Sequence, residues 1–306
     1  MRNTFVEELT KLATRDPNTI LITGDLGFGV LTHYAQQFPR QYINAGVAEQ
    51  NMTALAVGLA LEGKTVYTYS IANFPTLRCL EQIRNDACYH RANVKIVSIG
   101  AGFAYGPLGM SHHATEDLAI MRALPNLTLF SPADSHEVRL VTRAAHATAG
   151  VCYLRLGRGG EPTIHPAEPE YVPGEPIELF PAQEVVILGT GGIVAVAVQA
   201  RALLEARGVK VGVYSVPTVK PFPAAWLRQL ARRTRLFVTV EEHSRLGGLG
   251  GAVAEILAEQ REHGALLRCG LDDEFSCTVG AQDYLRRRYG LSAEKIAERI
   301  TAALAS

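Results

Sequence analysis

The first half of the chain alternates between two hydrophobic patterns. Short continuous apolar runs predict strands, and longer stretches with helical spacing of their apolar positions predict helices. The expected strands are residues 19–23, 64–69, 94–99, 127–130 and 151–156, and the expected helices are residues 4–13, 47–61, 75–91, 115–124 and 135–146. Strands that alternate with helices in this way predict a parallel sheet with helices on both faces.

The pattern stops at a proline-rich segment and then resumes. Six of the 15 prolines lie between Pro162 and Pro181, where neither a helical nor a strand period survives, so a linker is expected there. Beyond it, strands are expected at residues 184–188, 210–216, 236–240 and 265–268, and helices at residues 194–207 and 248–260. The sequence therefore predicts an α/β protein of two domains, residues 1–160 and 183–306, joined by a linker at 161–182.

Composition excludes several classes of partner. Thirty basic residues balance thirty acidic ones and the pI is about 7.1, so no overall field attracts nucleic acid or an anionic membrane. The longest apolar run, residues 192–200, is too short to span a bilayer, and the N-terminus opens an amphipathic helix unlike a signal peptide. We therefore expect a cytoplasmic protein. Five cysteines without a Cys-x-x-Cys pair argue against a disulfide framework or a zinc site and are expected to be buried thiols.

A glycine-rich turn follows the first expected strand of the second domain. Gly189-Thr-Gly-Gly192 does not have the G-x-G-x-x-G spacing of a dinucleotide loop, and the next strand runs into Val216-Pro217 instead of ending on an acidic residue. A tight turn from strand to helix accounts for it.

The segment Asn44-Ala-Gly-Val-Ala-Glu-Gln-Asn-Met52 places a carboxylate in an unusual position. It puts Glu49 in the first turn of a helix made largely of small residues, directly after a short strand. Taken alone, Glu49 is an acid that the helix dipole favours by about 1 kcal/mol or less. The small residues around it indicate that another group approaches this helix closely.

Further motifs stand before and after this segment in a fixed order. They are Thr23-Gly-Asp-Leu-Gly27, Tyr67-Thr-Tyr-Ser-Ile-Ala-Asn-Phe74, Gln82-Ile-Arg-Asn-Asp86, Gly109-Met-Ser-His-His-Ala-Thr-Glu-Asp117, Ser131-Pro-Ala-Asp134 and Leu154-Arg-Leu-Gly-Arg158. In this order and spacing the set resembles the C-terminal half of transketolase. Two later segments, residues 185–192 and 240–251, resemble the last domain of that family, so the resemblance covers nearly the whole chain.

The resemblance implies a fold and a cofactor site. It implies a thiamine diphosphate pyrimidine-binding domain followed by a transketolase C-terminal domain. Glu49 would hydrogen-bond the pyrimidine N1′, a task suited to a carboxyl group in an apolar pocket because desolvation favours the form that shares a proton. Phe74 would stack on the cofactor, Ile71 replaces a second family phenylalanine, and Asp25 is assigned to the same site. Packing at the end of a strand is the alternative for Phe74 and Ile71.

The resemblance also implies substrate-binding residues. His112 matches a histidine that assists proton transfer at the substrate carbonyl, and His113 beside it is assigned to the substrate site. Paired histidines can also bind a metal, but no third ligand has suitable spacing, so no metal is expected on this chain. Arg2 and Arg155 match two arginines that bind the substrate phosphate; a solvated terminal charge is the alternative for Arg2.

Two family residues are replaced. Leu108 stands where the family has an acidic residue that contacts a substrate hydroxyl, and Gly29 stands where it has a phosphate-binding serine. A site without a polar partner for a hydroxyl loses discrimination for it. We therefore expect a small anionic donor substrate that carries fewer hydroxyl groups than an ordinary pentose phosphate.

The chain lacks the other half of the cofactor site. The family binds the diphosphate through Mg²⁺ with a Gly-Asp-Gly segment and a later Asn, and no Gly-Asp-Gly occurs in this sequence. The resemblance thus implies an N-terminal (alpha) partner subunit that holds Mg²⁺, in an α2β2 heterotetramer with the active site at the interface.

Three functions remain open at this point. The leading one is the C-terminal (beta) subunit of a two-chain transketolase-like enzyme that transfers a two-carbon ketol or acyl unit. The nearest alternative is an E1 beta subunit of a 2-oxo acid dehydrogenase or a pyruvate-using enzyme similar to 1-deoxyxylulose-phosphate synthase. The third is a non-catalytic structural subunit, against which the retention of Glu49, Phe74, His112 and Arg155 argues.

Overall fold

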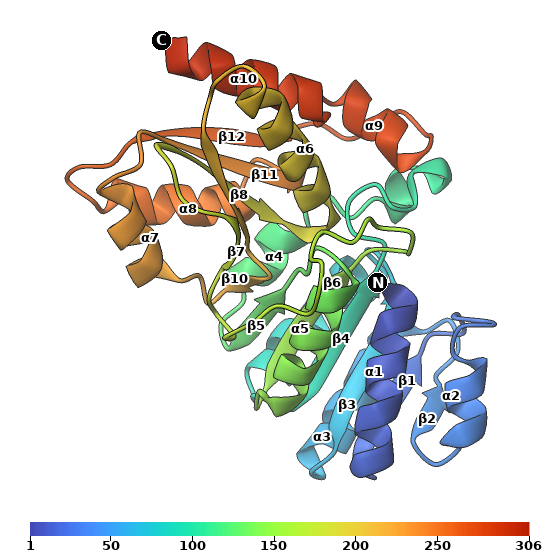
Figure 1. The fold of residues 1–306 in the computed structure, drawn as a ribbon. Coiled ribbons are helices and arrows are strands. Elements are labelled where there is room, and N and C mark those ends of the chain that lie inside the picture. Colours follow the sequence, from blue (N-terminus) through green and yellow to red (C-terminus); the bar gives the residue numbers. More distant parts are fainter. Residues whose placement is uncertain (306) are drawn as a thin grey trace.

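Two sheets, each enclosed by helices, build the protein (Figure 1). The computed structural model describes residues 1–305. In Figure 1 the N-terminal half lies below and the C-terminal half above. All strands of each sheet are parallel except one edge strand, which runs antiparallel to its neighbour. The predicted α/β class, with two mostly parallel sheets, is confirmed.

The first sheet has seven strands in the order β10-β5-β6-β4-β3-β1-β2. Its members are β1 (Thr19–Thr23), β2 (Tyr42–Asn44), β3 (Thr65–Ile71), β4 (Val94–Ile99), β5 (Leu127–Phe130), β6 (Val151–Leu156) and β10 (Thr218–Lys220). The last of these comes from the second half of the chain and pairs antiparallel with β5. Thr23 pairs with Tyr69 and Ile99 with Leu156, so the carboxyl ends of the parallel strands meet at one edge.

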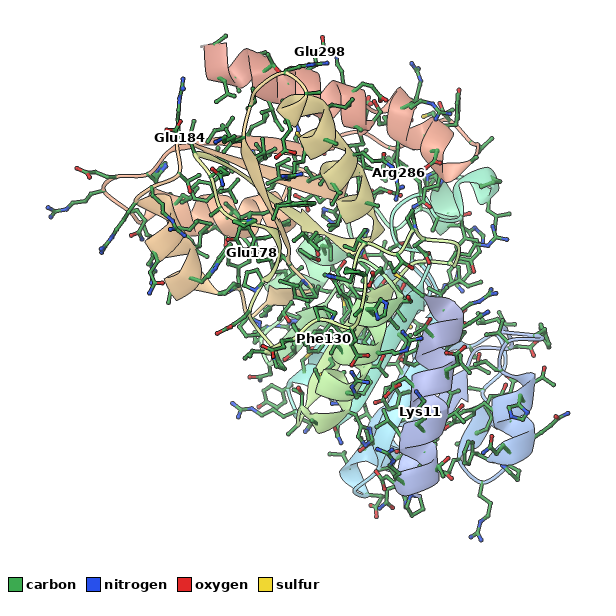
Figure 2. All side chains as sticks on the ribbon, in the orientation of Figure 1. Lys11, Phe130, Glu178, Glu184, Arg286 and Glu298 are labelled. Atoms are coloured by element: carbon green, nitrogen blue, oxygen red, sulfur yellow. The ribbon has the colours of Figure 1, made fainter. Side chains whose placement is uncertain are left out.

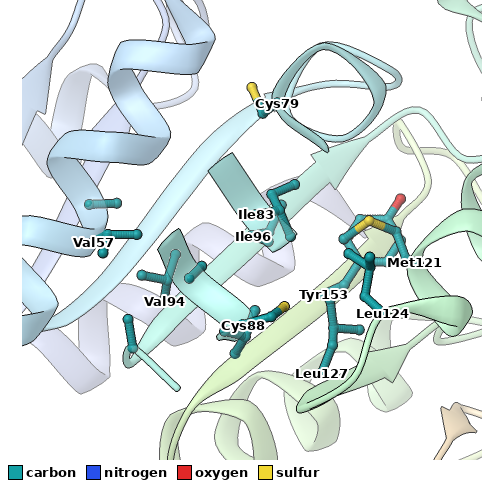
Figure 3. Close-up of a cluster of buried hydrophobic side chains, with 14 of the residues drawn as sticks. Val57, Cys79, Ile83, Cys88, Val94, Ile96, Met121, Leu124, Leu127 and Tyr153 are labelled. Atoms are coloured by element: carbon teal, nitrogen blue, oxygen red, sulfur yellow. The ribbon is translucent and has the colours of Figure 1, made fainter. Parts of the chain in front are cut away.

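Helices cover both faces of this sheet. α1 (Arg2–Arg15) and α5 (Ser135–Ala147) lie on one face with the short α2 (Thr32–Gln37), and α3 (Glu49–Leu61) and α4 (Asp117–Ala123) lie on the other. Figure 3 shows the core on the α3 side, to which the helices contribute Val57 and Met121 and the strands contribute residues such as Val94 and Ile96. Burial against the sheet therefore explains the apolar positions that predict α1, α3, α4 and α5, whereas α2 was not predicted.

The second sheet has five strands in the order β12-β11-β8-β9-β7. They are β7 (Ile177–Phe180), β8 (Val185–Thr190), β9 (Val211–Ser215), β11 (Leu236–Ser244) and β12 (Ala265–Leu271). One apolar core lies beneath α6 (Val194–Glu205), α9 (Gln282–Arg288) and α10 (Ala293–Ala305), and another beneath α7 (Ala224–Ala231) and α8 (Leu249–Ala258). The turn at Gly189-Thr-Gly-Gly192 is a tight connection from β8 to α6, as predicted.

One predicted helix has a different form. Instead of one α-helix over residues 75–91, the chain forms a 3-10 turn at Leu77–Cys79 and a π-helix at Gln82–Cys88. Cys79, Ile83 and Ala87 are all buried and recur every four residues. A helix with more than 3.6 residues per turn keeps residues that recur every four positions on one face. The burial of this series therefore accounts for the π-helix in place of an α-helix.

The prediction of buried thiols holds for four cysteines and is wrong for one. Cys79, Cys88, Cys152 and Cys269 are buried, whereas Cys277 is exposed. Burial raises the pKa of the Cys88 and Cys269 thiols to about 11, because it disfavours the thiolate. Among residues 1–305, no helix combines the length and the apolarity needed to cross a membrane.

A buried ion pair of the first half lies at the junction with the second half. Arg155 on β6 donates from Nε to Asp117 at 2.7 Å, and both side chains are almost fully buried. The same carboxylate oxygen accepts a 2.6 Å bond from the Tyr153 hydroxyl. Arg155 Nη2 donates to the Ala114 carbonyl of the first half and to the Glu242 carbonyl of β11. One guanidinium therefore ties both halves together.

We predict that Asp117→Asn destabilises the protein strongly. It leaves the buried Arg155 guanidinium without a compensating charge, and breaking a buried pair from one side costs about 3–5 kcal/mol of the free energy of unfolding. Denaturant unfolding measures this change. The matched control is Arg228→Ala, which removes an exposed pair with Glu259 and should change stability by about 1 kcal/mol or less. Equal effects of the two substitutions would contradict the prediction.

Candidate active site

Four loops meet where the parallel strands of the first sheet end. They follow β1, β3, β4 and β6, whose carboxyl ends lie at the same edge. This edge is the usual place for a ligand in an open parallel sheet. Most of the residues predicted for the active site lie on these loops or on the start of α3.

Glu49 is the first residue of α3 and is buried, with 3% of its surface exposed. The backbone of Gly24 passes beside it, because a Cβ atom placed on Gly24 would lie 3.5 Å from Glu49 Cγ. Its Oε2 accepts a hydrogen bond of 2.9 Å from Arg78 Nη1. The predicted start of the helix at residue 47 is two residues early, but the predicted first-turn position of the carboxylate is confirmed.

Arg78 connects Glu49 to Phe74, and the sequence motifs did not single it out. Its guanidinium carbon lies 4.6 Å from the centroid of the Phe74 ring, a distance typical of a cation–π contact. The Arg78 side chain is 48% exposed, so it lies at the surface of the site. The one signal in the sequence is a basic residue four positions after Phe74, within a segment that was expected to be a regular helix.

His112 also contacts the Phe74 ring. The two rings are 5.1 Å apart with an interplanar angle of 71°, and the His112 ring also meets Tyr105 edge-on at 6.3 Å. His112 Nδ1 is 3.0 Å from Ser111 Oγ. The structure thus brings Glu49, Phe74 and His112 into one continuous set of contacts, with Arg78 between the first two.

Burial lowers the pKa of His112, and the neighbouring His113 lowers it further. The sign follows from the cationic form of the imidazole, which both burial and a nearby positive charge disfavour. His112 is therefore neutral at pH 7. A neutral imidazole carries one N–H donor and one acceptor nitrogen.

His113 faces away from this set of contacts. It is buried, its Nε2 lies 3.3 Å from the Gly106 carbonyl, and its ring packs edge-on against Phe103. Its own carbonyl accepts a bond of 2.6 Å from Asn73 Nδ2. Asn73 lies in the turn after β3, so His113 fastens the histidine loop to the loop that carries Phe74. These contacts give it a positioning role.

The two arginines of the segment Leu154-Arg-Leu-Gly-Arg158 have different surroundings. Arg155 is 2% exposed, and its Nε and Nη2 are bonded to protein groups. Arg158, which follows β6, is exposed, and its guanidinium carbon lies 5.2 Å from the centroid of the Tyr105 ring. Arg158 is therefore the arginine of this segment that a ligand can reach, although the family motifs point to Arg155.

Arg2 is held close to the loop that carries Arg158. The N-terminal amine of Met1 forms an ion pair of 2.9 Å with Glu161, and Glu161 also accepts a bond from the Gly159 amide. Burial raises the pKa of the Tyr69 phenol, and the positive charge of Arg2 opposes this effect. The start of α1 thus adds a second positive charge to this side of the site.

The remaining predicted residues lie at the rim. Asp25 is exposed and forms a reciprocal pair with Asn44, donating from its amide at 3.0 Å and accepting from the side-chain amide at 2.9 Å. Ile71 ends β3, and its carbonyl accepts from the Phe74 amide. Leu108 is 55% exposed on the histidine loop. Gly29 has a φ of +76°, which disfavours a serine at this position.

One motif of the family resemblance has a structural explanation. Asp134 of Ser131-Pro-Ala-Asp134 caps α5, because its Oδ1 accepts from the amides of His136 and Glu137. Its Oδ2 accepts from the amides of Ile164 and His165. This carboxylate therefore fixes the segment after Arg158 and has no direct part in the site.

The arrangement suits a planar nitrogen heterocycle. The Glu49 carboxylate is buried, and its Oε2 faces the half-exposed side chain of Arg78. Such a carboxylate can accept a hydrogen bond from a ring N–H. An aromatic ring beside it can stack on the same heterocycle. These features fit the aminopyrimidine of thiamine diphosphate, and Glu49 and Phe74 are the residues that would hold it.

Two family models match the chain. Residues 1–161 match the family described as "Transketolase, pyrimidine binding domain", and residues 178–296 match the family described as "Transketolase, C-terminal domain". The boundary between the two matches falls in the proline-rich segment that separates β6 from β7.

Two enzyme subunits and one solved structure are similar over nearly their whole length. A subunit of the apulose-4-phosphate transketolase of Phocaeicola vulgatus is 33% identical, with 96% of this chain and 94% of that protein covered. A subunit of the 6-deoxy-6-sulfo-D-fructose transketolase of Clostridium sp. is 35% identical, with 97% and 92% covered. A structure described as "Split gene transketolase, inactive beta4 tetramer" has a TM-score of 0.89 and 35% identity, with 99% and 97% covered.

We predict an apparent pKa below 6.5 for His112 in the folded chain. Burial and the nearby His113 both disfavour the imidazolium, so protonation occurs only at a lower pH than in an unfolded peptide. NMR titration of the imidazole resonances measures it, and the His112→Asn variant assigns the signal. His113→Gln should move the value back toward 6.5. A value at or above 6.5 in the wild-type chain would contradict this.

Proposed function

The chain belongs to the transketolase family, as the C-terminal section of a split transketolase, and from this premise we propose the role of each residue in its site. The enzyme transfers a two-carbon unit from a donor ketose or 2-oxo acid to an aldehyde, with thiamine diphosphate as cofactor. The observation that carries the proposal is the continuous contact from Glu49 through Phe74 to His112 at the carboxyl ends of the strands. A purely structural subunit has no need of a buried carboxylate at this place.

Glu49 and Phe74 bind the cofactor's pyrimidine. Glu49 shares a proton with the pyrimidine N1′. Phe74 supplies an aromatic face, Ile71 an apolar one, and Asp25 lies at the rim. Bound thiamine diphosphate supplies the nucleophilic carbon for breaking and forming carbon–carbon bonds.

His112 and the exposed arginine act on the substrate. His112, neutral at pH 7, holds and moves a proton at the substrate carbonyl oxygen. Arg158 and Arg2 bind an anionic group at the far end of the substrate. We propose Arg158 in place of Arg155 for this task, because Arg155 is buried in the ion pair with Asp117.

A partner subunit completes the site. This sequence contains no Gly-Asp-Gly segment, and two of its relatives are themselves subunits of transketolases. We propose an alpha subunit that holds the diphosphate and Mg²⁺, in an α2β2 assembly. The similar protein whose structure has been solved is described as an inactive assembly of beta chains. This supports the need for a partner subunit.

The substrate is an anionic sugar with altered hydroxyl contacts. The names of the two relatives specify a sugar phosphate and a sulfo sugar, both of which carry an anionic group. Leu108 can accept no hydrogen bond from a hydroxyl and is exposed beside His112 on the same loop. We therefore propose a donor that is less hydroxylated than xylulose 5-phosphate near this loop.

The partner and Glu49 can be tested together. In calorimetry with Mg²⁺ present, the isolated chain should show no tight binding of thiamine diphosphate, whereas the complex with its alpha subunit should bind it. In that complex Glu49→Gln should lower kcat by about two to four orders of magnitude, as for the loss of a general acid.

The controls separate chemistry from folding. Circular dichroism should show that Glu49→Gln retains its helix content, and Glu62→Gln, a substitution at the exposed C-cap of the same helix, should keep full activity. Micromolar binding by the isolated chain would refute the split site. Near-normal turnover of Glu49→Gln would refute the role of the carboxylate.

Arg158→Ala should raise the KM for a phosphorylated substrate by about tenfold or more. A charge-assisted hydrogen bond contributes about 1.5–3 kcal/mol, and each 1.4 kcal/mol is tenfold. Steady-state kinetics of the complex with phosphorylated and unphosphorylated forms of one substrate measure the effect, which should vanish for the unphosphorylated form. Arg207→Ala, in the exposed segment after α6, is the control. An equal rise for both forms would contradict anion binding by Arg158.

A further inference from the structure

Arg78 makes two contacts that the cofactor also needs. Its Nη1 donates to Glu49 Oε2 at 2.9 Å, and its guanidinium carbon lies 4.6 Å from the centroid of the Phe74 ring. These are the carboxylate and the aromatic face that the proposed function gives to the pyrimidine. No role is assigned to Arg78 by the motifs that identify the family in this chain.

The guanidinium resembles an aminopyrimidine in its binding chemistry. It is planar and delocalised, presents N–H donors in its plane, and stacks on aromatic rings. A protonated aminopyrimidine likewise offers a ring N–H and an exocyclic amine in one plane. The two groups can therefore satisfy the same acceptor and the same ring face, but not at the same time.

We propose that Arg78 is a residue of the thiamine diphosphate site and competes with the cofactor's pyrimidine for Glu49 and Phe74. This inference rests on the proposed function, because it requires the pyrimidine to bind there. When the pyrimidine binds, the guanidinium leaves both contacts and turns toward solvent, and Glu49 exchanges an ion pair for the proton shared with N1′. Arg78 thus sets how tightly the assembled enzyme holds its cofactor.

The surroundings of Arg78 allow this movement. Its side chain is 48% exposed, whereas that of Glu49 is 4% exposed. Arg78 stands in the 3-10 turn Leu77–Cys79, at the entrance to the π-helix, and not within a regular α-helix. A partly exposed ion pair and an exposed cation–π contact are both weak interactions. A tightly bound cofactor can displace contacts of this strength.

The same contacts have a second effect on the isolated chain. Without Arg78 the buried Glu49 carboxylate has lost its ion-pair partner, and an unpaired buried charge is destabilising. Removing the guanidinium should therefore lower the stability of the isolated chain while it strengthens cofactor binding by the complex. Opposite signs in two measurements distinguish competition from a general loss of structure.

The experiment compares Arg78→Ala and Arg78→Lys with wild type in two assays. In the complex with the alpha subunit, calorimetry with thiamine diphosphate and Mg²⁺ should give a Kd for Arg78→Ala about tenfold lower than wild type, which corresponds to about 1.4 kcal/mol. Arg78→Lys, which retains a charge but lacks the planar fork, should lie between the two. Arg84→Ala, an exposed arginine on the following π-helix, should leave the Kd unchanged.

The second assay uses the isolated full-length chain. Arg78→Ala should lower its Tm by about 2–4 °C. The loss should disappear in the Glu49→Gln background, because a neutral side chain needs no ionic partner. This cycle depends on the Arg78–Glu49 contact alone, so it tests that contact even if the cofactor assay fails.

Each outcome decides the proposal. A weaker Kd for Arg78→Ala would mean that Arg78 binds the cofactor directly, and an unchanged Kd would make the ion pair a surface contact without influence on the site; either result overturns competition. Failure of the wild-type complex to bind thiamine diphosphate would instead refute the proposed function. An unchanged Tm in the cycle would show that the contact is absent in solution, which also overturns the inference.

Discussion

The buried ion pair between Arg155 and Asp117 is the contact on which the other parts of the arrangement depend. Both charges are removed from water, so they must remain together, and Nη2 of the guanidinium donates to carbonyls on either side of the junction. One of these carbonyls belongs to Ala114, which closes the base of the histidine loop through paired backbone bonds with Gly102. The position of His112 is thus fixed from the centre of the molecule.

The second half of the chain also holds the histidine loop in place. Glu242 on β11 accepts a 2.5 Å bond from the Phe103 amide at the start of the loop and a second 2.5 Å bond from Arg286, labelled on α9 in Figure 2. Gly102 must be glycine here, since a Cβ atom would lie 2.5 Å from the same carboxylate and φ is +59°. The C-terminal half therefore holds the start of the histidine loop in place.

Sequence reasoning located the carboxylate and both α/β halves because each depends on a pattern that runs over many residues. Glu49 follows from a strand, a turn and a helix start in succession. The sequence pointed to Arg155 for the substrate anion and not to Arg158, since it does not reveal that β6 is buried along its whole length and has no polar face. Arg78 was missed because a regular helix was expected at 75–91, and a change from 3-10 to π geometry rotates side chains in a way that hydrophobic spacing does not reveal. The domain boundaries, likewise, remain a prediction.

The edge strand β10 has a consequence for the order of folding. Residues 218–220 complete the first sheet beside β5, and Val219 belongs to the core of that sheet, although the chain has by then passed through three strands of the second sheet and the whole of α6. During synthesis, the N-terminal half cannot reach its full width until about 220 residues have left the ribosome. Until then the outer edge of β5 presents unpaired backbone groups that can recruit another strand. The two halves are built on separate sheets, but the first sheet is complete only after part of the second half has been synthesised.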